Sequence, residues 1–306
     1  MAYQAAPHYP AGPDLRRCSR VLALAGMALL MGCAAHAPAA ADARPVSGSA
    51  LQAQVARTVI EDQQRLAQLP PTRLAANLVD RVIHDLPVAQ HLALLKSLNP
   101  DALEQALDTD QKRLSFWINI YNGYAQYFLK QDPRLYKSDR SAFFAKRQIE
   151  VAGYRVAMEE IEHGVLRRGA TIWSLGHVRF LAFRSEFTQR FAVDQVDPRI
   201  HFALNCGARS CPPVVAYQAA IVDKQLDANS QRYLRNESRY DAASNEVHIP
   251  VLLLWFSADF GSREDKRQLL RKYGVIPGSA RPSLEYLDYD WSIAIENYAA
   301  FPQLQP

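Results

Sequence analysis

The stretches DQKRLSFWINIYNGYAQYFLK (residues 110–130) and QIEVAGYRV (residues 148–156) decide the fold class of this chain. In the first stretch, apolar residues recur at three- and four-residue spacings, which predicts one long helix ending at Asp132-Pro133. In the second stretch, the pattern changes to that of two short strands around Gly153, which predicts a hairpin. Helices that alternate irregularly with local hairpins are typical of an α+β fold rather than of a parallel doubly wound sheet.

The segments on either side of these stretches show the same mixture. Helical spacings predict helices at residues 101–107, 158–168, 221–234, 251–260 and 264–273, and a second hairpin is predicted at residues 238–241 and 246–249. Residues 199–204 alternate like a strand that leads into a loop at residues 205–213. The whole pattern predicts a helix-rich α+β fold with small antiparallel hairpins.

The first 33 residues are predicted to be a lipoprotein signal peptide with its lipobox. Three arginines at positions 16, 17 and 20 precede an apolar run, Val21–Met31, which is too short to span a bilayer as a stable helix. The run closes on Leu30-Met31-Gly32-Cys33, which resembles a bacterial lipobox. This resemblance implies cleavage before Cys33 and a diacylglycerol on its sulfur. The alternative is plain secretory cleavage within residues 35–39, with Cys33 incidental.

The remaining chain is predicted to divide into three parts. Residues 34–50 are rich in Ala, Pro and Ser and predict a disordered tether, because they offer almost no bulky apolar side chain. Residues 51–98 predict a helical preface, broken at Pro70-Pro71, and residues 99–298 predict the α+β domain. Since Ala34 rather than an aspartate follows the lipidated position, we expect an outer-membrane lipoprotein facing the periplasm. The alternative is a soluble periplasmic protein.

The charge of the chain argues against a nucleic-acid partner. Residues 1–32 hold three of the 35 basic residues and one, Asp14, of the 31 acidic residues, which leaves 32 against 30. A nearly neutral domain without a basic run is a poor candidate for binding nucleic acid. No later stretch approaches the ~20 apolar residues that a membrane-spanning helix needs, so the lipid anchor is the expected membrane contact.

The segment DPRIHFALNCGARSCP (residues 197–212) is the candidate for chemistry. Cys206 and Cys211 are the two cysteines outside the signal peptide and lipobox, and in an oxidising compartment they could form a disulfide. Alternatively, Cys206 is a nucleophile whose thiolate is favoured by the nearby His201, Arg199 and Arg209. His201 is either the base that partners Cys206 or a ring that hydrogen-bonds to backbone at the strand end. A further candidate base is His163, and the backbone N–H groups around Gly207 could bind an oxyanion.

Two further polar residues lie on helices with apolar faces. For Glu162 we favour an ion pair with Arg167 or Arg199 over a role in orienting the catalytic histidine. Asn119 and Asn122 lie three residues apart on one helix face, where buried asparagines mostly bind neighbouring backbone. The sequence has no CxxC pair, HExxH motif, phosphate-binding glycine loop or GxSxG motif, so we expect neither a metal nor a cofactor.

Four motifs in order carry a resemblance to a known family. They are FWINIYN (residues 116–122), IEHGVLR (residues 161–167), HFALNCGARSCP (residues 201–212) and YDWS (residues 289–292). Together they resemble the family called domain of unknown function 547, over roughly residues 100–295. The resemblance implies a fold similar to papain-like cysteine hydrolases, including a glutathione-hydrolase-like type. It also implies that Cys206, His201, Glu162 and Asn119 line the site.

Two functions of different classes follow from these observations. The first is a periplasmic cysteine hydrolase or acyl transferase that acts through Cys206 on a peptide, an isopeptide or a small γ-glutamyl compound. The second is a non-catalytic envelope module that binds a protein or a glycan, with a Cys206–Cys211 disulfide as a staple.

We expect Cys33→Ser to abolish lipid attachment, because the substituted hydroxyl cannot form the thioether. Mass spectrometry of the mature N-terminal peptide should find a diacylglycerol on Cys33 in the wild type and none in the variant. Cys18→Ser, a change within the signal peptide, should leave the modification intact. An unmodified wild-type N-terminus within residues 35–39 would contradict the lipobox prediction.

Overall fold

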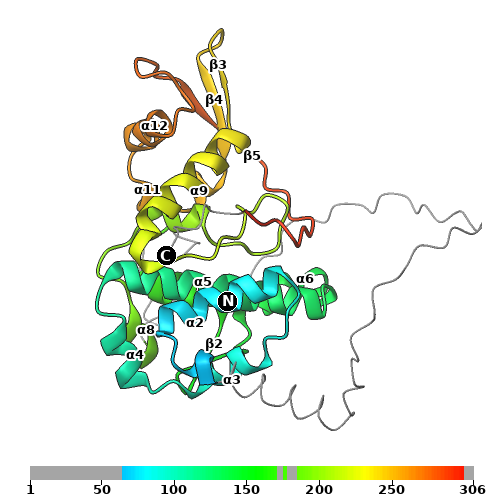
Figure 1. Ribbon diagram of the computed structural model, residues 1–306. Coiled ribbons are helices and arrows are strands. Elements are labelled where there is room, and N and C mark those ends of the chain that lie inside the picture. Colours follow the sequence, from blue (N-terminus) through cyan, green and yellow to red (C-terminus); the bar gives the residue numbers. More distant parts are fainter. Residues whose placement is uncertain (1–63, 171–174, 178–184, 300–306) are drawn as a thin grey trace, which may run out of the picture. The chain divides into compact units, whose positions relative to one another are not determined.

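The structure is a computed structural model that describes residues 64–170, 175–177 and 185–299. Its central helix is α5, Asp110–Gln131 (Figure 1). Thr109 begins the helix by accepting a hydrogen bond from the Lys112 amide, and the predicted end at Asp132-Pro133 is confirmed. Every residue from Leu114 to Gln126 is buried. Helix α5 is therefore covered on all sides instead of along one stripe.

The predicted α+β class with small antiparallel strand pairs is confirmed. The predicted signal peptide, the lipobox with Cys33, the tether and residues 51–63 of the preface lie outside the described residues. Within the described ranges, no helix is both long enough and apolar enough to cross a membrane.

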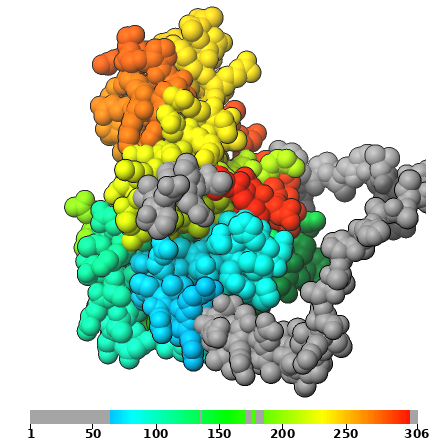
Figure 2. All heavy atoms as spheres, viewed as in Figure 1, coloured from blue at the N-terminus to red at the C-terminus, as the bar shows by residue number. Residues whose placement is uncertain are grey.

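Three helices from the N-terminal part of the described chain precede α5, and the first of them packs onto it. They are α2 (Pro71–Ile83), α3 (Ala89–Ser97) and α4 (Pro100–Ala106), and the predicted break at Pro70-Pro71 is the start of α2. Leu78 of α2 is fully buried and lies so close to Gly123 that a Cβ there would be 3.0 Å from Leu78 Cδ2. The segment predicted as a preface thus shares its core with the following residues. Figure 2 shows the cyan surface of these helices beside the red C-terminal segment.

The first predicted hairpin is confirmed as β1 (Ile149–Val151) and β2 (Tyr154–Val156), which pair antiparallel. Ala152 and Gly153 both have positive φ, at 49° and 76°, which is what a two-residue hairpin turn with matching twist requires. Their amides donate to Leu95 O and Lys96 O, so the turn is fixed against the end of α3. The short helices α6 (Arg134–Ser138) and α7 (Arg140–Ala145) connect α5 to this hairpin.

A second, smaller core forms around β3 (Arg239–Asp241) and β4 (Glu246–Pro250), which are the second predicted hairpin. Strand β5 (Ser283–Leu287), which the sequence analysis missed, pairs parallel with β4. Four helices flank this sheet: α9 (Val222–Glu237), α10 (Leu252–Trp255), α11 (Ser257–Phe260) and α12 (Arg263–Lys272). Helix α9 contacts both α5 and β4 and so joins the two cores (Figure 1).

Two predicted elements differ in type from those observed. The strand predicted at residues 199–204 is wrong: Pro198–Phe202 form the 3-10 helix η3. Pro198 supplies helical φ, and the Asp197 side chain accepts from the Arg199 amide, so both start a helical turn. The helix predicted at residues 158–168 is a π-helix, η1 (Glu160–Leu166), and α8 (Glu186–Phe191) and η4 (Ala219–Ile221) complete the order.

We expect Leu78→Ala to lower the free energy of unfolding by about 2–5 kcal/mol, because it leaves a cavity between α2 and α5. Leu86→Ala is the matched control: Leu86 is 46 % exposed, and its truncation should change stability by less than ~0.5 kcal/mol. Urea unfolding followed by circular dichroism measures both. Equal effects would mean that the N-terminal helices do not share the core of α5.

Candidate functional site

Two cysteines lie at the centre of the candidate site, in the thiol loop (residues 205–213). The Cys206 and Cys211 Sγ atoms are 2.8 Å apart as free thiols. Cys206 is half-buried, whereas Cys211 is only 4 % exposed. The Cys206 amide donates to Cys211 Sγ at 3.0 Å, and the Tyr289 hydroxyl lies 3.6 Å from Cys206 Sγ and 3.2 Å from Cys211 Sγ.

The two thiols differ in acidity. The pKa of Cys206 is lowered, chiefly by the hydrogen bond from the Cys211 thiol and further by the Ala208 amide and the Tyr289 hydroxyl, which together outweigh burial. Burial raises the pKa of Cys211 well above its ordinary value, and the bond with Cys206 adds to this rise. Burial and the neighbouring thiols also raise the pKa of Tyr289, which therefore remains protonated as a donor. The structure thus pairs a half-buried, more acidic cysteine with a buried, less acidic one.

Three amide side chains on α5 position the thiol loop, and we call them the amide stripe: Asn119, Asn122 and Gln126. Asn122 accepts from the Asn205 amide at 2.8 Å and donates to Ala203 O at 2.9 Å. Gln126 donates to Asn205 Oδ1 at 3.0 Å. Asn119 Nδ2 donates to Tyr217 O at 2.7 Å, and Asn119 Oδ1 accepts from the Tyr217 amide at 2.9 Å. Asn119, which the resemblance places in the site, thus holds the backbone that follows the thiol loop.

Helix α9 binds the opposite side of the same segment. Asn229 donates to Phe202 O at 2.7 Å and to Pro213 O at 3.2 Å. Gln225 donates to Ala216 O at 2.9 Å and accepts from the Gln218 amide at 2.7 Å. Residues 202–218 are therefore fixed between amide side chains of two helices that are far apart in the sequence.

The backbone amides expected to bind an oxyanion already have partners. Asn205 Oδ1 accepts from the Gly207 amide, and the Ala208 amide donates to the Cys206 sulfur. The Arg209 and Ser210 amides donate to Ser292 O and Asp290 O, and the Cys211 amide donates to Ala208 O. In this arrangement, none of the amides from Cys206 to Cys211 is free to receive a carbonyl oxygen.

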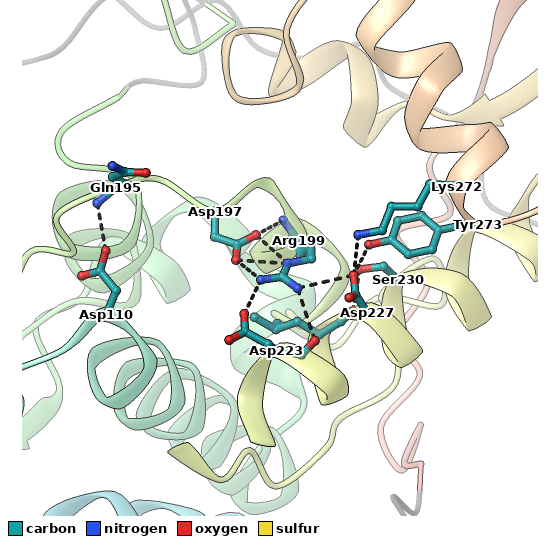
Figure 3. Close-up of polar contacts among 10 residues, drawn as sticks. Asp110, Gln195, Asp197, Arg199, Asp223, Asp227, Ser230, Lys272 and Tyr273 are labelled. Carbon is teal, nitrogen blue, oxygen red and sulfur yellow. Dashed lines mark hydrogen bonds and ion pairs between the residues drawn. The ribbon is translucent and has the colours of Figure 1, made fainter. Parts of the chain in front are cut away.

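The arginines expected to favour the Cys206 thiolate are paired with carboxylates instead. Arg199 binds Asp197, Asp223 and Asp227, and Asp227 in turn binds Lys272 and Tyr273 (Figure 3). This network attaches η3 to α9 and α12. Arg209 lies 3.5 Å from Asp290, at the exposed rim of the loop. Hydrogen bonds, rather than these cations, therefore lower the pKa of Cys206.

His201 belongs to a buried ionic cluster. Its Nε2 lies 2.8 Å from Asp259 Oδ2, which also accepts from Arg167 Nε at 2.6 Å. The His201 ring stacks on Phe256, with ring centroids 3.7 Å apart. Burial lowers the pKa of His201 despite the contact with Asp259, so the ring is neutral at pH 7. Asp259 was missed by the sequence analysis because it lies 58 residues from His201, in a segment with no motif of its own.

Glu162 and His163 project from the π-helix η1, a helix type frequent at functional sites. Glu162 is hydrogen-bonded to Tyr121, and burial raises the pKa of Glu162 against the attraction of His201 and Arg167. Its charge also raises the pKa of Cys206, so it lies between the ionic cluster and the thiols. The expected ion pair with Arg167 or Arg199 is not formed: Arg167 pairs with Asp259 and Arg199 with other aspartates, and Arg167 acts on Glu162 only through its charge.

His163 contacts the same cluster from its other side. Its Nδ1 lies 3.1 Å from Arg167 Nη1, and burial together with Arg167 lowers the pKa of His163 to about 3. Arg167 is fully buried, and its Nη2 has no hydrogen-bond partner. Within the described ranges, no group of three or more His, Cys, Asp or Glu side chains is arranged to hold a metal ion.

The comparison with known families agrees with the four motifs. The sequence model of the family described as "Protein of unknown function, DUF547" matches residues 105–234, which confirms the resemblance. No curated protein and no solved structure matches the chain. Asp259 and Tyr289, which complete the site, lie C-terminal to the matched residues.

We expect Asn119→Ala to lower the free energy of unfolding by about 2–4 kcal/mol, because it leaves the amide and carbonyl of Tyr217 unpaired in the core. Asn236→Ala, on the exposed side of α9, is the control and should change stability by less than ~0.5 kcal/mol. Thermal and urea unfolding measure both variants. A fully stable Asn119→Ala protein would argue that this asparagine serves the site and not the fold.

Proposed function

We propose, on the premise that residues 105–234 carry a domain of this family, that Cys206 and Cys211 are a redox-active dithiol which exchanges with external disulfides. The observation that carries the proposal is the 2.8 Å contact between two thiols of opposite pKa shift, one in a half-buried residue and one in a buried residue. Exchange needs this asymmetry, because the attacking sulfur must be a thiolate within reach of solvent and the second sulfur must be close behind it.

The reaction has two steps. The Cys206 thiolate attacks one sulfur of an external disulfide, and the other sulfur leaves as a thiol after taking up a proton. Cys211 then loses its proton and attacks Cys206 Sγ in the mixed disulfide, which releases the second external thiol. In sum, two protein thiols are oxidised to one disulfide and one external disulfide is reduced to two thiols.

Tyr289 supports both steps. Its hydroxyl is within reach of both sulfurs, so it can donate to the Cys206 thiolate before the attack and to whichever sulfur carries charge afterwards. The pKa of Tyr289 is raised and that of Cys206 is lowered, so Tyr289 still holds its proton at the pH at which Cys206 ionises.

A second candidate is a cysteine hydrolase or acyl transferase acting through Cys206 on a peptide or a γ-glutamyl compound. The neutral His201, held by Asp259 next to Glu162, favours it, because these groups could accept and return a proton. A papain-like arrangement of the core is part of this candidate. The loop amides would first have to exchange their present partners for an oxyanion. The dithiol proposal needs no such change.

Export completes the proposal. We place the protein in the periplasm as an outer-membrane lipoprotein anchored through Cys33, on the strength of the lipobox. An oxidising compartment supplies the disulfides that a dithiol of this kind would exchange with.

We expect the reduced wild-type protein to reduce hydroxyethyl disulfide, and Cys206→Ser to abolish this reaction. Cys211→Ser should instead accumulate a mixed disulfide on Cys206, since the second attack is lost; intact-mass spectrometry detects it. Ser210→Ala is a control within the thiol loop. Because the pKa of Cys206 is lowered, the attack rate should reach half its maximum below the ordinary thiol pKa of about 8.5.

Other outcomes would identify the alternatives. Full activity of Cys211→Ser on an acyl substrate would favour the hydrolase. A Cys206–Cys211 disulfide that resists reduction in the native state, with a loss of about 2–5 kcal/mol when either cysteine is replaced, would favour the binding module with a structural staple.

A further inference from the structure

A cluster of aromatic rings lies directly beside the thiols. Tyr289, whose hydroxyl touches both sulfurs, packs on Trp291 and Trp255 with ring centroids 4.5 Å and 5.2 Å away. The two tryptophans stack on each other at 5.7 Å and an interplanar angle of 20°. All three side chains are only half-buried, so part of each ring faces solvent.

A cation completes this surface. The guanidinium of Arg140, at the start of α7, lies 3.9 Å from the centroid of the Trp291 ring. Its polar contact is with the hydroxyl of Tyr136, and among the described residues no carboxylate is paired with it. Other arginines around the site differ: Arg199 and Arg209 are each paired with aspartates. Arg140 is therefore the positive group near the thiols that a ligand could still neutralise.

We propose that Arg140, Trp255, Tyr289 and Trp291 form the recognition surface for the disulfide substrate, and that the substrate is a small organic disulfide bearing a carboxylate. This inference rests on the proposed dithiol function and names its substrate class. The carboxylate binds the Arg140 guanidinium, the adjoining methylenes and sulfur lie on the aromatic rings, and the disulfide reaches Cys206 past Tyr289.

The limited exposure of Cys206 and of the rings around it favours a small substrate. Cys206 is half-buried beside Tyr289, and the rings that flank it are half-buried as well. A sulfur recessed in this way is more accessible to a small flexible disulfide than to one held in a folded protein. The aromatic faces can pack against the apolar part of any such disulfide, so the charge of Arg140 is the feature that distinguishes one substrate from another.

The test compares three disulfides with identical two-carbon arms: dithiodipropionate, which carries carboxylates, neutral hydroxyethyl disulfide, and cystamine, which carries ammonium groups. For each disulfide, the rate of reaction with the reduced wild-type protein is divided by the rate at which the same disulfide reacts with a small neutral thiol. This ratio removes the differences in intrinsic reactivity among the three disulfides. We expect a preference of roughly threefold to tenfold for dithiodipropionate over the neutral probe at low ionic strength, weakened by salt.

Arg140→Gln should remove this preference, so that the normalised rates with dithiodipropionate and with the neutral probe become equal. Arg140→Lys should retain part of it. Arg209→Gln is the matched control, because that arginine is already paired with Asp290 at the rim of the thiol loop, and it should keep the preference in full. Circular dichroism confirms that each variant is folded.

The outcomes separate the two proposals. Absence of reaction with all three disulfides overturns the dithiol function itself. Reaction with all three disulfides, with a normalised ratio that Arg140→Gln does not change, overturns the recognition surface alone. If Arg140→Gln and Arg209→Gln reduce the preference for dithiodipropionate equally, the overall electrostatic field of the protein, and not Arg140, selects the anionic substrate.

Discussion

The amide stripe of α5 is the constraint on which the rest of the site depends. Asn119, Asn122 and Gln126 lie on one face of a helix that is otherwise buried among apolar residues, and each binds polar groups of the segment that carries the thiols. Buried amides and backbone groups must pair with one another, because an unpaired one costs about 1–3 kcal/mol. The pairing therefore fixes where residues 202–218 lie, and Asn229 and Gln225 of α9 bind them from the other side.

This fixed loop allows two cysteines five residues apart to lie in contact while differing in exposure and acidity. Gly207 is essential to its path: φ is +88°, and a Cβ there would lie 2.4 Å from Leu129 Cδ1 on α5. The loop thus presses directly on the helix that holds it. The Cys211 thiol, with the Ala208 amide, lowers the pKa of Cys206. The Ala208 and Gly207 amides already have partners and so are not available to an oxyanion.

Two polar regions meet at Glu162. On one side are the thiols and Tyr289, and on the other is the ionic cluster of His201, Asp259 and Arg167. Glu162 raises the pKa of Cys206, and burial raises the pKa of Glu162 itself against the charge of Arg167, so this carboxyl group interacts with both regions. The residues that complete the site, Asp259 and Tyr289, come from the C-terminal third of the chain, next to the aromatic surface of Trp255 and Trp291.

Local features could be predicted from the amino-acid sequence: the long helix α5, both hairpins, the α+β class, the family resemblance and the segment that carries the thiols. Periodicity and turn chemistry act within a few residues, so they can be recognised without knowledge of the fold. The sequence did not reveal η3, because the alternation of residues 199–204 is that of a strand while Pro198 and the Asp197 side chain start a helical turn there. It did not reveal β5 either, whose partner residues in β4 lie 37 positions away in the chain. Packing in three dimensions was needed to show that His201 binds Asp259, that three aspartates neutralise Arg199, and that the backbone held by Asn119 is that of Tyr217. These pairings join residues 24 to 98 positions apart or depend on a turn that brings neighbours together, and only packing in three dimensions selects among the possible partners.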